Sequence, residues 1–128
     1  MKELTKAEEE IMQVLWRLEK AFINDILAEL PEPRPAYNTV STIVRILEKK
    51  GFVDHHAYGK SYEYYPLILK KEYTRKYFGH FMKNYFSNSY REMVSFFTSD
   101  NNLDIAELEE LKQAMAEEII RKKIANDE

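Results

Sequence analysis

Apolar residues recur at helical spacing in three successive segments of the N-terminal half of the chain. The first begins at Thr5, which forms a capping-box pattern with Glu8, and its apolar side carries Ala7, Ile11, Val14, Leu15 and Leu18. A second, shorter helix is predicted over residues 23–30, where the run "PEPRP" must end it because proline lacks an amide donor. A third helix is predicted over residues 37–50 and is stopped by Gly51.

The spacing then becomes typical of a β-hairpin. Strand-like runs at residues 52–58 and 61–65 flank a turn at Gly59 and Lys60, and Pro66 ends the second run. Glycine supplies the backbone freedom that a tight hairpin turn requires. The sequence therefore predicts a small two-stranded wing after three helices.

The C-terminal half is helical in pattern. Residues 69–97 have helical spacing and many aromatic side chains, which predicts one long helix, with a kink or a close helix crossing at Gly79. The run "TSDNN" breaks the pattern, and Asp104 begins the cap of a last helix. The element order predicts a mainly α (α+β) fold. We expect residues 1–68 to form a winged helix-turn-helix with a β-hairpin wing, and residues 69–128 to form a two-helix dimerisation unit.

Composition narrows the class of protein. The 128 residues are 45% hydrophobic and 32% charged, with no run of about 18 apolar residues, so we expect no membrane insertion. The charged start "MKELTKAEEE" lacks the apolar core of a signal peptide, so a cytoplasmic location is expected. The absence of cysteine excludes disulfides, thiolate catalysis and thiolate metal sites.

The polar face of the third predicted helix is unusual. Solvated helix faces are normally rich in Glu, Lys and Gln, but the side opposite the apolar stripe here carries Asn38, Ser41, Thr42, Arg45 and Lys49. Short side chains let a backbone approach the DNA major groove, where arginine pairs with guanine and asparagine with adenine. We therefore predict double-stranded DNA as the partner. The expected contacts come from Arg34, Tyr37, Asn38, Thr39, Ser41, Thr42, Arg45, Lys49 and Lys60.

Charge modifies this interpretation without deciding it. The net charge is −3, but residues 1–32, 33–66, 67–91 and 92–128 carry local nets of −4, +2, +5 and −6. Binding to a polyanion depends on the field at one surface, so the negative total does not exclude it. Lys49 and Lys50 at the helix end, and Lys60 at the hairpin tip, suit phosphates. The alternatives are an ordinary solvated helix face, and a winged-helix adaptor that binds a protein and no DNA.

No catalytic or metal-binding pattern is present in the sequence. His55 and His56 are adjacent on a strand, so their side chains point to opposite faces and cannot form one metal site together. There is no Gly-rich phosphate loop, no Ser/His/Asp arrangement and no His/Glu metal spacing. We predict no enzyme activity, no cofactor and no metal.

The aromatic density of residues 73–97 exceeds what one helix can bury against a single neighbour. An intramolecular core is one explanation, but burial against a second subunit fits better, and a two-fold homodimer suits a palindromic operator. The predicted interface residues are Tyr73, Tyr77, Phe81, Tyr85, Leu108, Leu111, Met115 and Ile119.

The stretches "LTKAEEEIMQVLW", "NTVSTIVRILEKKGFVDH", "KSYEYYPLI" and "LDIAELEELKQ" resemble the penicillinase repressor family of the BlaI/MecI/CopY type. This resemblance covers nearly the whole chain. It implies a homodimeric winged-helix repressor on a palindromic operator of a β-lactam-resistance or related operon, working with a membrane sensor-protease circuit.

Three departures from the family pattern are visible. The copper-responsive branch has a Cys-rich metal site, which a chain without cysteine does not share. The β-lactam-responsive branch is cleaved at an Asn–Phe bond, and the equivalent bond here is Phe96–Phe97, a candidate proteolytic site whose first residue is changed. Ile46 stands where the family often has Arg, which implies an altered operator preference.

Overall fold

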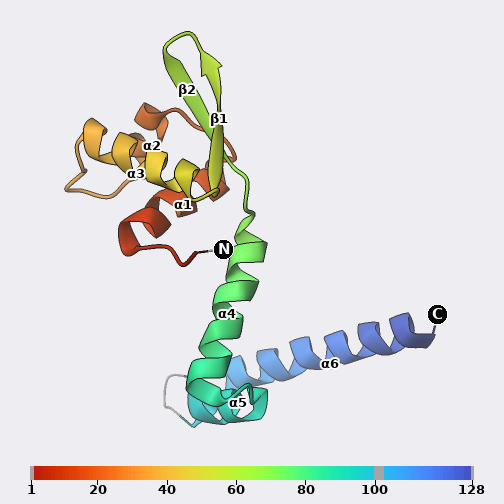
Figure 1. Ribbon diagram of the computed structural model, residues 1–128. Helices are drawn as coiled ribbons and strands as arrows, with labels where there is room; N and C mark the ends of the chain where they lie inside the picture. The colour runs from red at the N-terminus through yellow and green to blue at the C-terminus, as the bar shows by residue number, and fades with distance from the viewer. Residues whose placement is uncertain (1, 100–102, 128) are drawn as a thin grey trace. The chain divides into compact units, whose positions relative to one another are not determined.

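The computed structural model describes residues 2–99 and 103–127, which form six helices and one two-stranded antiparallel sheet (Figure 1). These residues divide into two compact units, Met1–Phe78 and Gly79–Glu128. Helix α4 (Lys70–Phe86) passes from the first unit into the second. The boundary predicted between residues 68 and 69 falls just before α4, and it stays a prediction.

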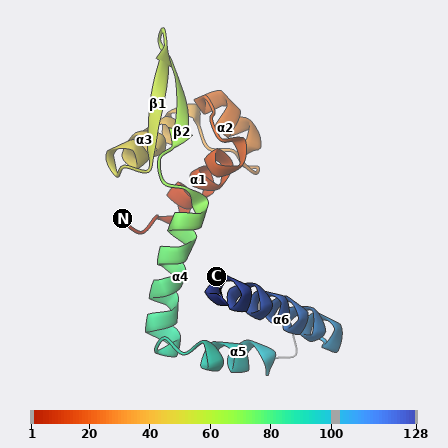
Figure 2. The ribbon, with the colours of Figure 1, turned by 90° about the vertical axis from the view of Figure 1, so that its right-hand side faces the viewer.

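The N-terminal unit has the predicted winged helix-turn-helix architecture. Its elements are α1 (Lys6–Leu18), α2 (Ile23–Glu29), α3 (Tyr37–Lys49), β1 (Val53–Tyr58) and β2 (Ser61–Pro66). The hairpin projects beyond the helices in both ribbon views (Figure 2). Tyr58 pairs with Ser61, so the tight turn consists of Gly59 and Lys60, with Gly59 at φ +63°. That left-handed conformation is the reason for a glycine at this position.

Three helices and the base of the wing share one core. Its fully buried side chains include members from α1, α2, α3 and the residue before β1: Met12, Leu15, Ile26, Val40, Val44, Leu47 and Phe52. Ala21 forms an isolated antiparallel bridge with Tyr64 of β2. Its N–H donates to the Tyr64 carbonyl, and its carbonyl accepts from the Tyr64 N–H. The apolar stripe of α3 is thus held inside, and its other face is left at the surface.

The first turns of α4 belong to this N-terminal core. Tyr73 was predicted to lie in a dimer interface, but it is only 8% exposed and packs against Trp16 and Phe52 at ring-centroid distances of 5.9 and 5.8 Å. The Leu4 N–H donates to its hydroxyl at 3.0 Å. Burial raises the pKa of Tyr73, so the phenol stays neutral. This placement corrects the prediction, since burial of Tyr73 needs no second subunit.

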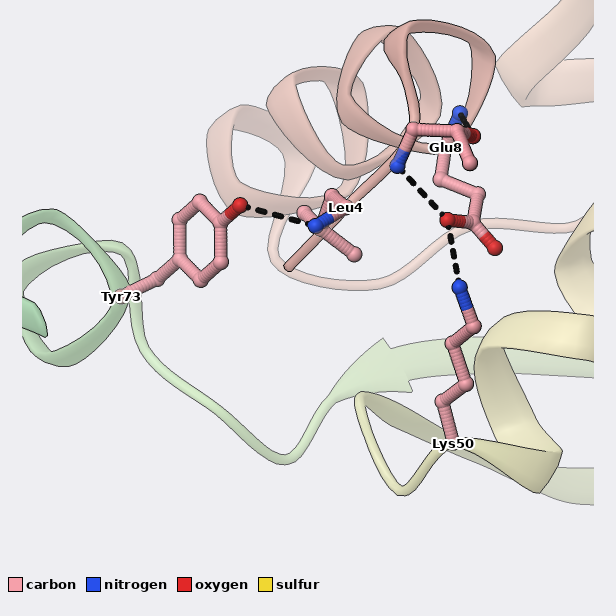
Figure 3. A network of polar contacts seen from close by, with 5 residues as sticks. Leu4, Glu8, Lys50 and Tyr73 are labelled. Carbon is pink, nitrogen blue, oxygen red and sulfur yellow. Dashed lines mark hydrogen bonds and ion pairs between the residues drawn. The ribbon is translucent and has the colours of Figure 1, made fainter. Parts of the chain in front are cut away.

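A polar network closes the same core at the start of α1 (Figure 3). Glu8 is 4% exposed, accepts from the Thr5 N–H at 2.8 Å and pairs with Lys50 Nζ at 2.8 Å, while its own N–H donates to Thr5 Oγ1. The predicted capping box is therefore confirmed. Burial alone would raise the pKa of Glu8, but the ammonium of Lys50 and the hydrogen bonds of Thr5 outweigh it, and the pKa is lowered.

The prediction of one long helix over residues 69–97 is wrong in one respect, because this segment forms two helices. Helix α4 continues through Gly79 and ends at Phe86, and α5 (Tyr90–Thr98) begins after a break in which Ser87 and Asn88 have φ of +49° and +64°. The Ser89 side chain caps α5 by accepting from the Glu92 N–H. The sequence signal that was overlooked is the run "SNS", since short polar residues mark turns and caps.

Gly79 and the last helix complete the C-terminal unit. Apart from its chain neighbours and the backbone of its own helix, no described atom lies within 4 Å of the position that a Cβ of Gly79 would take, so no other described element of the chain crosses α4 closely there. Helix α6 (Ile105–Asp127) starts with the predicted Asp104 cap, whose carboxylate accepts from the Glu107 N–H at 2.9 Å. Residues 100–102 of the predicted break lie outside the described residues. Within the described ranges, none of the helices is long and apolar enough to span a membrane.

The Glu8–Lys50 pair gives a testable pH dependence. Because the folded-state pKa of Glu8 is lowered, its contribution is complete above the ordinary value of 4.5 and is lost as the pH falls through the lowered value. Replacing Glu8→Gln should reduce the free energy of unfolding at pH 7 by about 1–3 kcal/mol, and this difference should shrink at acid pH. Denaturant melts across pH would measure it.

The matched control is Glu10→Gln, which removes the same charge from an exposed position of α1. It should change the free energy of unfolding by less than about 0.5 kcal/mol at any pH. Equal effects of the two substitutions would contradict a stabilising role for the buried carboxylate.

Candidate nucleic-acid interface

The polar face of α3 lies at the surface, where a partner can reach it. The side chains of Asn38, Thr39, Thr42, Arg45 and Lys49 are exposed and that of Ser41 is half-buried. Tyr37, at the first turn, is 50% exposed. The structure thus brings together, on one helix, seven of the nine residues predicted to contact DNA. Their contact with DNA itself stays a prediction.

A groove runs between this face and the wing. It has a volume of about 690 Å³, and its walls come from the start of α2, from α3 and from both strands: Phe22, Ile23, Asn24, Asp25, Tyr37, Ser41, Arg45, Tyr58, Lys60, Ser61, Tyr62 and Tyr64. Lys60 is exposed at the hairpin turn. Two predicted cations, Arg45 and Lys60, therefore line the same groove although they are 15 residues apart in the sequence.

The sequence did not predict that the start of α2 would form a wall of this groove. Asp25 caps α2 by accepting from the Phe22 N–H, and Phe22 packs on Tyr58 of the wing at a ring-centroid distance of 6.0 Å. Local spacing identified α2 as a helix, but it carries no information about which wing residue its first turn meets. The short capping run "FIND" was the available signal for a helix start.

Electrostatic coupling links the groove to the end of α3. Burial raises the pKa of Tyr64, and the carboxylate of Glu48 raises it further, whereas the guanidinium of Arg45 lowers it. Glu48 therefore lies close enough to Arg45 and the wing tyrosines to influence the field at this surface. Negative charge at that position opposes the approach of phosphates.

Two predicted phosphate contacts are engaged within the chain. Lys50 was expected beside Lys49 at the DNA, but its ammonium pairs with buried Glu8, so that expectation is wrong for Lys50. Arg34 donates from Nε to the Leu30 carbonyl at 3.2 Å and from Nη2 to the Ala28 carbonyl at 3.4 Å. Arg34 thus closes the C-terminal end of α2, where carbonyls lack helical partners. Its side chain remains about half exposed.

The strand histidines lie on opposite faces of the wing, as alternation predicts. His55 stacks on Tyr62 with ring centroids 4.1 Å apart, and His56 stacks on Tyr65 at 4.9 Å. His55 also contacts Glu48 of α3. Each histidine therefore has its own aromatic neighbour, and the two rings share no site.

Most of the predicted dimer residues are exposed on the C-terminal half. Tyr77, Phe81 and Tyr85 of α4 are 51%, 37% and 74% exposed. On α6, Leu111, Met115 and Ile119 are at least 41% exposed, and Leu108 is half-buried. Val94 and Phe97 of α5 line a shallow groove of about 270 Å³ together with the Leu108, Leu111 and Met115 side chains. Within the unit, α6 therefore buries little of its apolar surface.

Residues 4–117 match the model of the penicillinase repressor family. The chain belongs to this family. It is 28% identical over 114 residues to the methicillin resistance regulatory protein MecI of Mammaliicoccus sciuri, which covers 88% of this chain and 93% of that protein. It is 29% identical over 122 residues to the penicillinase repressor of Bacillus licheniformis, and this match covers 94% of this chain and 95% of that protein. The solution structure of the DNA binding domain of the repressor BlaI is 31% identical, covers 57% of this chain and 94% of that chain, and has a TM-score of 0.49.

Family membership confirms the resemblance seen in the sequence. This member of the penicillinase repressor family is a DNA-binding transcriptional repressor, and the adaptor alternative is not favoured. Transcriptional repressors are not a class of enzyme. The exposed face of α3 is the surface that such a repressor needs.

Adjacent lysines of this family member should behave differently toward DNA. Lys49→Ala should reduce the salt dependence of binding, the slope of log K against log salt, by about 0.9 for the lost phosphate contact. Lys50→Ala should leave that slope unchanged and should lower the free energy of unfolding by about 1–3 kcal/mol, because Glu8 loses its partner. Anisotropy titrations at several salt concentrations and denaturant melts would measure both quantities. Equal slopes for the two variants would contradict the assignment.

Proposed function

We propose that the protein represses transcription in the cytoplasm as a homodimer on a palindromic operator, with one α3 in the major groove of each half-site. The observation that carries this proposal is the exposed, short, polar and cationic face of α3 beside the Lys60 wing. Such a face matches the donors and acceptors of base edges, and the wing tip reaches the backbone. Arg34 contributes to the backbone contacts through its exposed half.

The homodimer is supported by the exposed apolar surface of the C-terminal half. Helix α6 has 23 residues, and none of those described is buried. Exposed apolar side chains in this number favour an interaction site. A second copy covers it without any further component, and a two-fold pair presents two recognition helices to one palindrome. The proposed interface comprises Tyr77, Phe81, Tyr85, Leu108, Leu111, Met115 and Ile119.

The regulated genes follow from the same family relationship. The relatives are named as a methicillin resistance regulator and a penicillinase repressor, which supports a β-lactam-resistance-like operon as the target here. A membrane sensor-protease circuit would act at the Phe96–Phe97 bond. That bond lies inside α5, so cleavage requires local opening of the helix, even though the Phe96 side chain is 66% exposed.

Base specificity should depend on Arg45. Arg45→Ala should reduce the base preference at one position of each half-site by about 1–3 kcal/mol, because a bidentate contact with guanine is lost. Lys60→Ala is the matched cationic control, and it should reduce the affinity for all DNA sequences by the same factor. Competition titrations with duplexes from the promoter of its own operon, varied one base pair at a time, would separate the two effects.

The proposed function fails if the protein binds no DNA at any salt concentration, or binds it without regard to sequence and salt. A stable complex with another protein, in place of DNA binding, would revive the adaptor alternative.

The dimer should be broken by charge on the apolar side of α6. Met115→Asp should raise the dimer dissociation constant by roughly 30-fold or more, from a loss of about 2 kcal/mol. Gln113→Asp introduces the same charge on the opposite side of the helix and should leave the dimer intact. Sedimentation equilibrium would measure both. A wild-type mass equal to one chain at micromolar concentrations would contradict the dimer.

A further inference from the structure

Three metal-ligating side chains converge where the end of α3 meets the start of the wing. Glu48 comes from the last turn of α3, and Asp54 and His55 come from the first half of β1. His55 Nδ1 lies 2.5 Å from Glu48 Oε2 and 3.9 Å from Asp54 Oδ1. One ligand atom from each residue lies within 4.8 Å of the other two. This is the spacing of donors that can surround one ion after small side-chain movements.

Two of the three donors are already oriented. The His55 ring is stacked on Tyr62 at a centroid distance of 4.1 Å and an angle of 17°, and Tyr64 packs on it at 5.5 Å. These rings hold the imidazole with Nδ1 toward α3. Asp54 and His55 alternate along β1, but Asp54 Oδ1 turns back to accept from the His55 N–H at 2.8 Å and lies 3.9 Å from His55 Nδ1. A preorganised donor set reduces the entropy lost when a ligand binds.

We infer that Glu48, Asp54 and His55 form a binding site for a divalent transition-metal ion of the zinc type. Imidazole nitrogen with carboxylate oxygen is a donor set that Zn²⁺ accepts, at about 2.0–2.2 Å from each ligand atom. An imidazole donor disfavours Mg²⁺ and Ca²⁺, which prefer oxygen ligands alone. Three protein ligands leave the remaining coordination positions to water.

The position of this site gives the ion a consequence for DNA binding. Glu48 lies about 60° around α3 from Arg45, on the flank that faces the wing. With a neutral imidazole, the two carboxylates carry a formal charge of −2, which a divalent ion brings to zero. The bound ion therefore removes a repulsion toward phosphates and ties the recognition helix to the wing. This consequence rests on the proposed function, whereas metal binding itself does not.

The ion should bind the chelator-treated full-length protein at one site per chain. Isothermal titration with Zn²⁺, and the visible absorption of Co²⁺ as a second probe, would measure it. His55→Ala should weaken the affinity by roughly tenfold or more. The matched control is His56→Ala, which removes the neighbouring histidine whose ring stacks on Tyr65, and it should bind as the wild type does.

Glu48→Gln serves as a second ligand variant if His55→Ala fails to fold, and it should weaken binding to a similar extent. The site is overturned if the wild type does not bind Zn²⁺. It is also overturned if His55→Ala and His56→Ala lose affinity equally, which would place the ion elsewhere. The Glu48–His55 contact would then be an ion pair only.

A separate titration tests the link to DNA. Zn²⁺ should strengthen binding of the wild type and of His56→Ala to an operator duplex by several-fold, and should have no effect on His55→Ala. Zn²⁺ binding without any change in DNA affinity would overturn the link and leave the metal site standing. Loss of DNA binding with or without Zn²⁺ would instead count against the proposed function.

Discussion

The buried carboxylate of Glu8 is the constraint on which the placement of α3 depends. A charge at 4% exposure is tolerated only when it is paired and hydrogen-bonded, and Lys50 and Thr5 meet that condition. Thr5 begins α1 and Lys50 follows α3, so the pair joins the start of one helix to the end of the other. Leu4 extends the link to α4 through the Tyr73 hydroxyl. The polar face of α3 is thus backed by polar contacts that join α1, α3 and α4.

A chain of net charge −3 can still present cationic side chains along one groove. Lys50 is paired internally, and of the 22 acidic residues only three lie in residues 33–66, against eight in residues 1–32 and ten in residues 92–128. Arg45 and Lys60 line one groove, where their fields add. Glu48 works against them at the edge of that groove. Local arrangement of charge therefore matters more for this surface than its total.

Features that depend on local spacing were predictable, and features that depend on tertiary contacts were not. The N-terminal helices, the wing and the polar face of α3 follow from periodicity and turn residues, and all were confirmed as elements. The break at Ser87 was missed because aromatic periodicity continues across it. Lys50 and Tyr73 were misplaced because their partners, Glu8 and Leu4, lie 42 and 69 residues away. The contact between Glu48 and His55 could not be predicted for the same reason, since it forms only when α3 and β1 pack together.

The two-residue corner at Ser87 and Asn88 makes the C-terminal half sensitive to changes in chain length. Left-handed backbone costs about 1–2 kcal/mol per non-glycine residue. The conformation of Ser87 and Asn88 is therefore stable only when the packing of the neighbouring residues compensates for this cost. Phe86 and Phe96 pack across it at a ring-centroid distance of 5.7 Å. One residue inserted before α5 would rotate every later side chain of that helix by about 100°. Phe96 would leave Phe86, and a different set of side chains would face outward. A single codon gained or lost here would therefore change which apolar side chains the C-terminal half exposes, while leaving α3 unchanged.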